Sequence, residues 1–286
     1  MMKKLRSSAL PLLPVLFLLL PACAARQAAM GGAGPAAGET YAWPRGTQVE
    51  YVLTAVQTQI VDIPGGGEQV LSSNSTIDLK VAVTGDRDYA VTYTGATQHD
   101  DAAELGAPVP DISRLVGLVS QVRLDGQGEV VEATGLEGNS YVIDSGGVAP
   151  FRELNIQVVF PYLPEGRLSA GAQWSREYGF TIVQMDGTTL YFNVKDDYTC
   201  VEETLFNGTP AWKITLTSSQ NVTGSGDIGV PMELAMSGNG QADIHVARDT
   251  AMMLGNEWKM IFGGNISAQG MNIPISITQA VNVTKK

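Results

Sequence analysis

Apolar and polar residues alternate with a period of two through most of this chain, and that alternation limits the fold more than any other feature. Val49, Tyr51 and Leu53 alternate with polar neighbours, and residues 77–83 repeat the pattern. Successive side chains of a β-strand point to opposite faces, so the pattern predicts strands with one buried and one exposed face. We therefore expect a mainly β protein.

Turn signals divide the alternating stretches into strands. Turns at residues 63–68 and 84–88 predict three antiparallel strands joined by hairpins between residues 45 and 98. From residue 172 onward the predicted strands are 174–185, 189–202, 211–223, 228–236, 241–247, 252–262 and 266–283. The predicted turns between them include Asn207-Gly208 and the glycine-rich stretches 224–226, 238–240 and 263–264.

The middle of the chain departs from this period and predicts two short helices. Residues 111–119 place apolar side chains at helical spacing behind Pro110, and residues 148–160 do so less regularly. Between them, residues 121–124 and 129–134 predict a strand pair. The apolar helix faces are Ile112, Leu115, Val116 and Val119 in the first helix, and Phe151, Leu154 and Val158 in the second.

Strand length predicts curvature. Strands of about 14 residues extend about 45 Å, and a compact chain of this size is only about 45 to 50 Å across. We expect a large curved antiparallel sheet, a half-barrel or open barrel of about ten strands or more, with the two short helices packed on its concave face. This architecture is similar to that of bacterial lipoprotein-carrier and mycobacterial glycolipid-carrier proteins. The resemblance implies an apolar pocket for acyl chains, lined by the two helix faces.

The N-terminus has the features of an export signal. Basic residues at Lys3, Lys4 and Arg6 precede an apolar run over residues 10–20, which is too short to span a membrane comfortably. Leu20-Pro21-Ala22-Cys23 resembles the lipobox of bacterial lipoproteins, which implies cleavage before Cys23 and lipid attachment to its thiol. Two or three acyl chains would anchor the protein stably. The alternative is an ordinary secretory signal cut near Ala22-Cys23-Ala24.

These features divide the chain into three parts. Residues 1–22 form the predicted signal peptide, residues 23–42 the lipidated cysteine with a flexible Ala/Gly tether, and residues 43–286 a single β domain. Removing the signal changes the formal charge from 18 − 29 = −11 to 15 − 29 = −14. An acidic body is a poor ligand for nucleic acid, so we expect none as a partner and membrane attachment through the lipid. Ala24, where enteric inner-membrane lipoproteins carry aspartate, implies the outer membrane.

A second resemblance lies at residues 160–174. There a Leu163-Pro164 element precedes Leu168, Gly171 and Trp174, which enters a long predicted strand. The segment is similar to one in a family of uncharacterised bacterial lipoproteins, domains of unknown function, in which valine is commoner at the position of Leu168. No activity is implied by that resemblance.

Residues suited to catalysis are few. His99, Asp100 and Asp101 are adjacent in the chain and do not converge as metal ligands do, and His245 is predicted to face solvent. With Cys23 acylated, Cys200 has no disulfide partner, and its strand context favours a buried apolar role. No nucleophile elbow, P-loop or dinucleotide-binding motif is present in the sequence. We therefore expect no metal, no cofactor and no enzyme activity.

Two functions from different classes fit the sequence. The first is a monomeric, lipid-anchored binding module that holds a lipid or other apolar ligand between the sheet and the helices, in a pocket above about 300 Å³. The second is a structural or protein-partner-binding lipoprotein without a ligand cavity.

Replacing Cys23 by alanine tests the anchor. We expect Cys23→Ala to leave a folded domain and to move the protein out of the membrane fraction, because no other feature of the acidic chain favours membrane attachment. Fractionation of cells followed by circular dichroism of the released protein measures both effects. A variant that stays membrane-bound would contradict the lipobox interpretation.

Overall fold

The computed structural model describes residues 43–104, 111–135, 140–142, 148–150, 157–183, 188–227 and 231–286. Eleven of the described strands form one sheet. Their bounds are β1 Gln48–Ile63, β2 Gly67–Val83, β3 Asp88–Asp100, β4 Val119–Leu124, β5 Val130–Thr134, β8 Gln173–Val183, β9 Thr189–Phe206, β10 Thr209–Asp227, β11 Pro231–Ala247, β12 Met253–Ala268 and β13 Met271–Lys285. Two further strands, β6 Ser140–Val142 and β7 Val148–Pro150, pair with each other.

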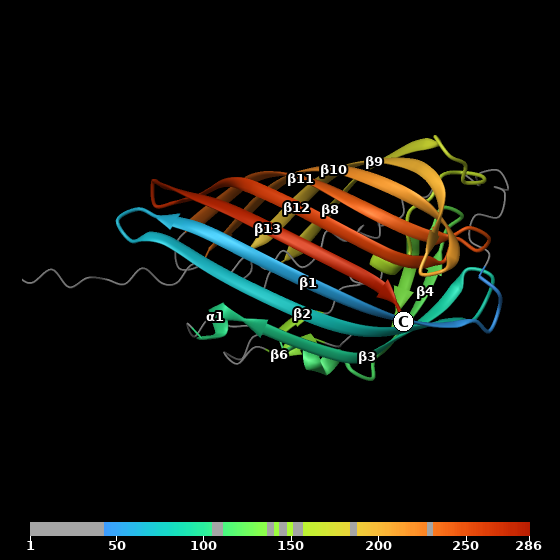
Figure 1. The fold of residues 1–286 in the computed structure, drawn as a ribbon. Coiled ribbons are helices and arrows are strands. Elements are labelled where there is room, and N and C mark those ends of the chain that lie inside the picture. Colours follow the sequence, from blue (N-terminus) through green and yellow to red (C-terminus); the bar gives the residue numbers. More distant parts are fainter. Residues whose placement is uncertain are drawn as a thin grey trace, which may run out of the picture.

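The large sheet is antiparallel throughout and is ordered β5-β4-β3-β2-β1-β13-β12-β11-β10-β9-β8. Every neighbour is the preceding or following strand in the chain except at the centre, where β1 pairs with β13. Figure 1 shows this long, curved sheet, with the blue β1 beside the red β13. Strands β5 and β8 form its two edges. The expected mainly β fold with a large curved sheet is confirmed.

Alternation of residue type explains the curvature and the core. Along β11 every second residue from Met232 to Val246 is buried on the concave face, and the intervening residues up to Asp243 are exposed. The same pattern runs along β9 and β13. The inner faces of the strands therefore form one continuous apolar core, and the polar outer faces meet water.

The sheet has two distinguishable ends. The near end carries the turns at residues 84–87, 207–208 and 248–252, and the far end carries those at 64–66 and 269–270. At the near end, the rings of Trp43, Tyr89 and Phe160 pack together with centroids 4.9 to 5.9 Å apart. The hydroxyl of Tyr51 donates to the carbonyl of Met253, 3.0 Å away. The near end is thus filled by side chains of the protein.

The two predicted helices are wrong. Residues 111–119 form only the 3₁₀ turn η1, Ile112–Leu115, and β4 already begins at Val119. Gly117 has φ +90° and the preceding Val116 is extended, so the helix cannot continue. In the second segment the described residues form β7 and the 3₁₀ turn η3, Gln157–Val159. The remaining helical turn is α1, Asp101–Glu104.

Three predicted turns also lie inside strands. Residues 224–226 belong to β10, 238–240 to β11 and 263–264 to β12, whereas the real turn between β12 and β13 is Gln269-Gly270, with both φ angles positive. Several of these glycines are needed for packing. A Cβ atom on Gly238 would collide with the ring of Phe262, and one on Gly240 would lie 2.8 Å from the Cε of Met260. Missing side chains on β11 therefore leave space for large side chains of β12.

Replacing Gly238 by alanine tests this packing. We expect Gly238→Ala to lower the free energy of unfolding by about 1 to 3 kcal/mol, the usual cost of overpacking a core, because the new methyl group meets Phe262. Gly263→Ala is the matched control, since a Cβ atom there has no heavy atom within 4 Å. Urea denaturation of both variants measures the difference. Equal stability would show that Phe262 does not need the space over Gly238.

Candidate functional site

A row of polar side chains crosses the inner face of the sheet at a single register position. Each member lies directly opposite the next across neighbouring strands, from β3 at one side to β8 at the other, with Met260 and Gly240 filling the two positions on β12 and β11. We call this set the polar row; it consists of Asp100, Ser73, Gln57, Gln279, Ser218, Asp196 and Arg176. It divides the inner face into a near half and a far half, named after the two ends of the sheet.

Asp196 lies in β9 and is one of the two acidic members of the polar row. Its side chain is buried and accepts hydrogen bonds from the hydroxyls of Tyr178 and Tyr198, at 3.2 and 3.4 Å. Burial raises the pKa of Asp196 above its ordinary value, and the hydrogen bonds from Ser218 and Tyr178 together with the Arg176 charge oppose that rise. A carboxyl group surrounded in this way is a strong hydrogen-bond acceptor inside an otherwise apolar core.

Arg176 compensates this buried acid. Its guanidinium Nη2 lies 2.8 Å from the Oε1 of Glu129, and its side chain is only 5% exposed. The guanidinium also stacks between two rings, 4.8 Å from the centroid of Tyr162 and 4.3 Å from that of Tyr178. Planar guanidinium groups suit such a position, because they pair with carboxylates at their edge and with aromatic rings at their face.

This ion pair connects the two edges of the open sheet. Glu129 directly precedes the edge strand β5, and Arg176 lies in the opposite edge strand β8. Leu163 lies beside this seam and exchanges hydrogen bonds with Gln127 of the β4–β5 turn, at 2.8 and 3.2 Å. On the other side, Trp174 of β8 donates its indole N–H to the carbonyl of Tyr162. Residues 160–163 therefore join β8 to the β4–β5 turn and close the near half.

A cavity of about 70 Å³ lies between residues 158–162 and the inner face of β8 to β13. Its polar lining comes from the polar row and its neighbours, and its apolar lining from the near half. Gln220 is only 2% exposed, and neither its Oε1 nor the Oδ1 of Asn256 has a hydrogen-bond partner in the described part of the chain. The polar and aromatic residues that line it include Tyr178, Asp196, Ser218, Gln220, Asn256 and Trp258.

The structure separates the residues predicted to line a pocket. Val158 lines the cavity, and Ile112 and Leu115 are buried in the core. Val116 and Val119 are 48% and 38% exposed, so they do not line a buried pocket. Both side chains are exposed because the predicted helix, which would have turned them inward, does not form. Two further predicted residues, Phe151 and Leu154, and the predicted lipid attachment site Cys23 lie outside the described residues.

Other reactive side chains lie apart from this site. Cys200 is buried without a disulfide, and burial raises the pKa of its thiol. His245 is on the outer face and stacks on Phe206, and its pKa is lowered by burial and by Lys213. His99 lies 3.4 Å from Asp101 at the surface. Within the described ranges, no three His, Cys, Asp or Glu side chains gather as metal ligands, and no helix is long and apolar enough to cross a membrane.

Arg176, Asp196, Ser218 and Gln220 were not predicted as a site from the sequence. The available signal was their parity, since each is a polar residue at a position where its strand otherwise carries apolar ones. Parity places these side chains on the inner face. Their alignment into one row depends on hairpin registers, which are visible only in the structure.

Comparisons with known proteins identify no relative. No family model and no curated protein matches the chain. Among solved structures, a loop L8 deletion mutant of OmpT, an outer membrane protein of Vibrio cholerae, matches 85% of this chain and 100% of its own at 8% identity, with a TM-score of 0.21. Outer-membrane expressed OmpT of Vibrio cholerae matches 85% and 99% at 7% identity, with a TM-score of 0.18. Scores this low do not show a shared fold.

Removing one partner of the buried ion pair tests the closure of the seam. We expect Arg176→Met to lower the free energy of unfolding by about 3 kcal/mol, because it leaves the Glu129 and Asp196 carboxyls without their cation. Arg123→Met is the control, since Arg123 pairs with Glu132 in the same β4–β5 hairpin with both side chains exposed and should cost at most about 1 kcal/mol. Urea denaturation measures both. Similar losses would show that the seam is not held by this pair.

Proposed function

We propose that this chain is a lipid-anchored envelope protein, a non-catalytic binding module that holds a lipid or other apolar ligand on the far half of its sheet. The observation that carries the proposal is the composition of that half, where all but a few inward positions are apolar. The apolar residues there are Val61, Leu71, Leu190, Phe192, Val194, Val222, Met232, Leu234, Met236, Phe262, Ile266, Ile273, Ile275 and Ile277.

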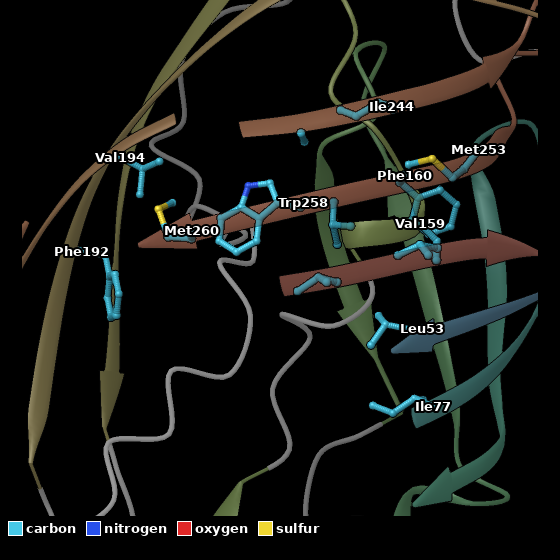
Figure 2. Packing of buried hydrophobic residues seen from close by; sticks show 14 of the residues in the cluster. Leu53, Ile77, Val159, Phe160, Phe192, Val194, Ile244, Met253, Trp258 and Met260 are labelled. Atoms are coloured by element: carbon cyan, nitrogen blue, oxygen red, sulfur yellow. The ribbon is translucent and has the colours of Figure 1, made fainter. Parts of the chain in front are cut away.

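The position of residues 157–163 favours the far half over the near half as the binding surface. Phe160 packs on Trp43 and Tyr89 at the near end. In Figure 2, Val159 and Phe160 lie on the side of Met253, whereas Phe192, Val194 and Met260 lie on the other side of Trp258. The side chains of Val159 and Phe160 thus occupy the near half, and an acyl chain would lie along the far half. The apolar side chains of the far half are buried in the folded chain, so the ligand would exchange contacts within the core for contacts with its own methylenes.

The open seam provides a route for such a ligand. The contacts of Glu129 and Leu163 join the β4–β5 turn to β8 and to residues 160–163 in the near half. No ladder pairs the two edge strands in the described ranges. An extended ligand would enter between the edges without disrupting the long hairpins of β9 to β13.

The anchor completes the proposed role. The lipobox-like sequence ending in Cys23 and the tether that follows would hold the acidic domain close to a bacterial membrane, and Ala24 favours the outer membrane. An amphiphile released from that membrane would be available to a sheet held near its surface.

The small cavity favours a second candidate. Small-molecule sites commonly have volumes of about 300 to 1,000 Å³, and the cavity beside residues 158–162 is about 70 Å³. A fully packed body would act instead as a structural or protein-partner-binding lipoprotein. The two candidates differ in whether an added acyl chain enters the far half.

Filling the far half tests the proposal. In the full chain carrying Cys23→Ala, we expect a fluorescent fatty acid to bind, and the further change Val194→Trp to weaken binding about tenfold or more because Val194 points inward. Lys195→Trp places the same side chain on the outer face of β9 and should leave binding unchanged. Fluorescence titration measures affinity, and circular dichroism checks folding.

A second pair, Met236→Trp against Ser237→Trp on β11, repeats the test if Val194→Trp unfolds. No uptake of the fatty acid by a folded chain, and no acyl species in native mass spectra of the purified protein, would contradict the proposal. That result would favour the partner-binding candidate, which crosslinking in the envelope then tests.

A further inference from the structure

We propose that the cavity beside Asp196 is a head-group subsite for an uncharged, hydroxyl-bearing amphiphile, of which a monoacylglycerol is the simplest example. The inference rests on the proposed function, because it assigns the acyl chain of that amphiphile to the far half. It adds the class of head group and the residues that select it.

The cavity lies mainly in the near half and crosses the polar row as far as Gln220. Ser218 and Asp196 belong to the polar row, and Gln220 is directly opposite Val194 in the next row on the far-half side. Trp258 and Leu216 line the cavity from the near half. A ligand with its polar end in the cavity therefore has its chain directed along Val194 and the apolar positions beyond it.

The resident charges disfavour a charged head group. Arg176 and Glu129 form an ion pair next to the Asp196 carboxyl, so charges of both signs already lie within a low-dielectric region. An anionic head group would face the carboxyl of Asp196 at close range. An ammonium group would lose its hydration on entering a buried site next to the Arg176–Glu129 pair, which already neutralises part of the local charge. A neutral head group avoids both the repulsion from Asp196 and this loss of hydration.

The unpartnered atoms select a hydrogen-bond donor. Gln220 donates from Nε2 to the Oγ of Ser218 at 3.5 Å, which leaves its Oε1 as the buried atom without a partner in the described part of the chain. The Oδ1 of Asn256 also lacks a partner in the described ranges, but Asn256 lies three register rows from Gln220, within the near half. A buried acceptor without a donor is costly. A hydroxyl group beside Gln220 supplies the missing donor, whereas an ester or ether oxygen does not.

The cavity volume limits the size of the head group. A cavity needs about 10 to 15 Å³ of such volume to hold one water molecule, so a cavity of about 70 Å³ holds a group of about five to seven non-hydrogen atoms. A glycerol head group fits this volume. A hexose does not.

A matched pair of ligands tests the subsite. In the full chain carrying Cys23→Ala, we expect calorimetric titration below the critical micelle concentration to show 1-monolauroylglycerol binding at least tenfold more tightly than methyl laurate, which has the same acyl chain without a donor. Gln220→Met keeps the side-chain length and removes the acceptor, so it should abolish this preference while leaving the affinity for methyl laurate unchanged. Asn221→Met, on the outer face of the same strand, is the control and should keep the preference.

The outcomes separate this inference from the function on which it rests. If both ligands bind equally, or if Gln220→Met keeps the preference, the head-group subsite is overturned and apolar-ligand binding stands. If neither ligand binds to the folded chain, both are overturned. If Gln220→Met fails to fold, Gln220→Leu takes its place with the same expected loss of preference, because it removes the same unpartnered acceptor.

Discussion

The fold depends on one register being maintained across eleven strands, because a shift of one residue between two strands would exchange the inner and outer faces. The pairing of β1 with β13 is unshifted over its whole length and joins the two halves of the chain. The four irregularities, at 78/79, 123/124, 213/214 and 245/246, all lie between the polar row and the near end. Bulges increase local twist and bend. Their placement accounts for a sheet that curls enough to bring its edges together at the near half.

Closure at that half is electrostatic as much as apolar. A buried ion pair contributes little net stability compared with apolar groups of the same shape, because both charges lose their hydration. The pair instead fixes orientation. The planar guanidinium of Arg176 binds Glu129 at its edge, and the rings of Tyr162 and Tyr178 stack on its faces. An apolar side chain at this position would pack against many neighbours equally well. The guanidinium fixes how the β4–β5 turn lies against β8.

The alternation of residues predicted the strands, the outward position of His245 and the two hairpins that join the first three strands, since each depends only on local parity. The predicted turns at 238–240 and 263–264 are wrong. The sequence alone does not distinguish a glycine that makes space for Phe262 from a glycine that forms a turn. The helix at 111–119 failed because the spacing of Ile112 and Leu115 is also satisfied by a single 3₁₀ turn that ends at Gly117. The polar row was not predictable, because Asp196 and Arg176 become neighbours only through the β8–β9 register.

A line of buried polar groups across an apolar sheet is difficult to explain by stability alone. Each of these groups loses hydration on folding, and an apolar residue at the same inward position would not. The cost is greatest where an acceptor is left without a donor, as at Gln220 and Asn256. Gln220 lies at the boundary between a near half that contains Phe160 and its neighbours and a far half that is apolar, and Asn256 lies within the near half. An inner face with this arrangement is complementary to an amphiphile rather than to a hydrocarbon. The lipid proposed to bind there is distinct from the lipid proposed to anchor the chain.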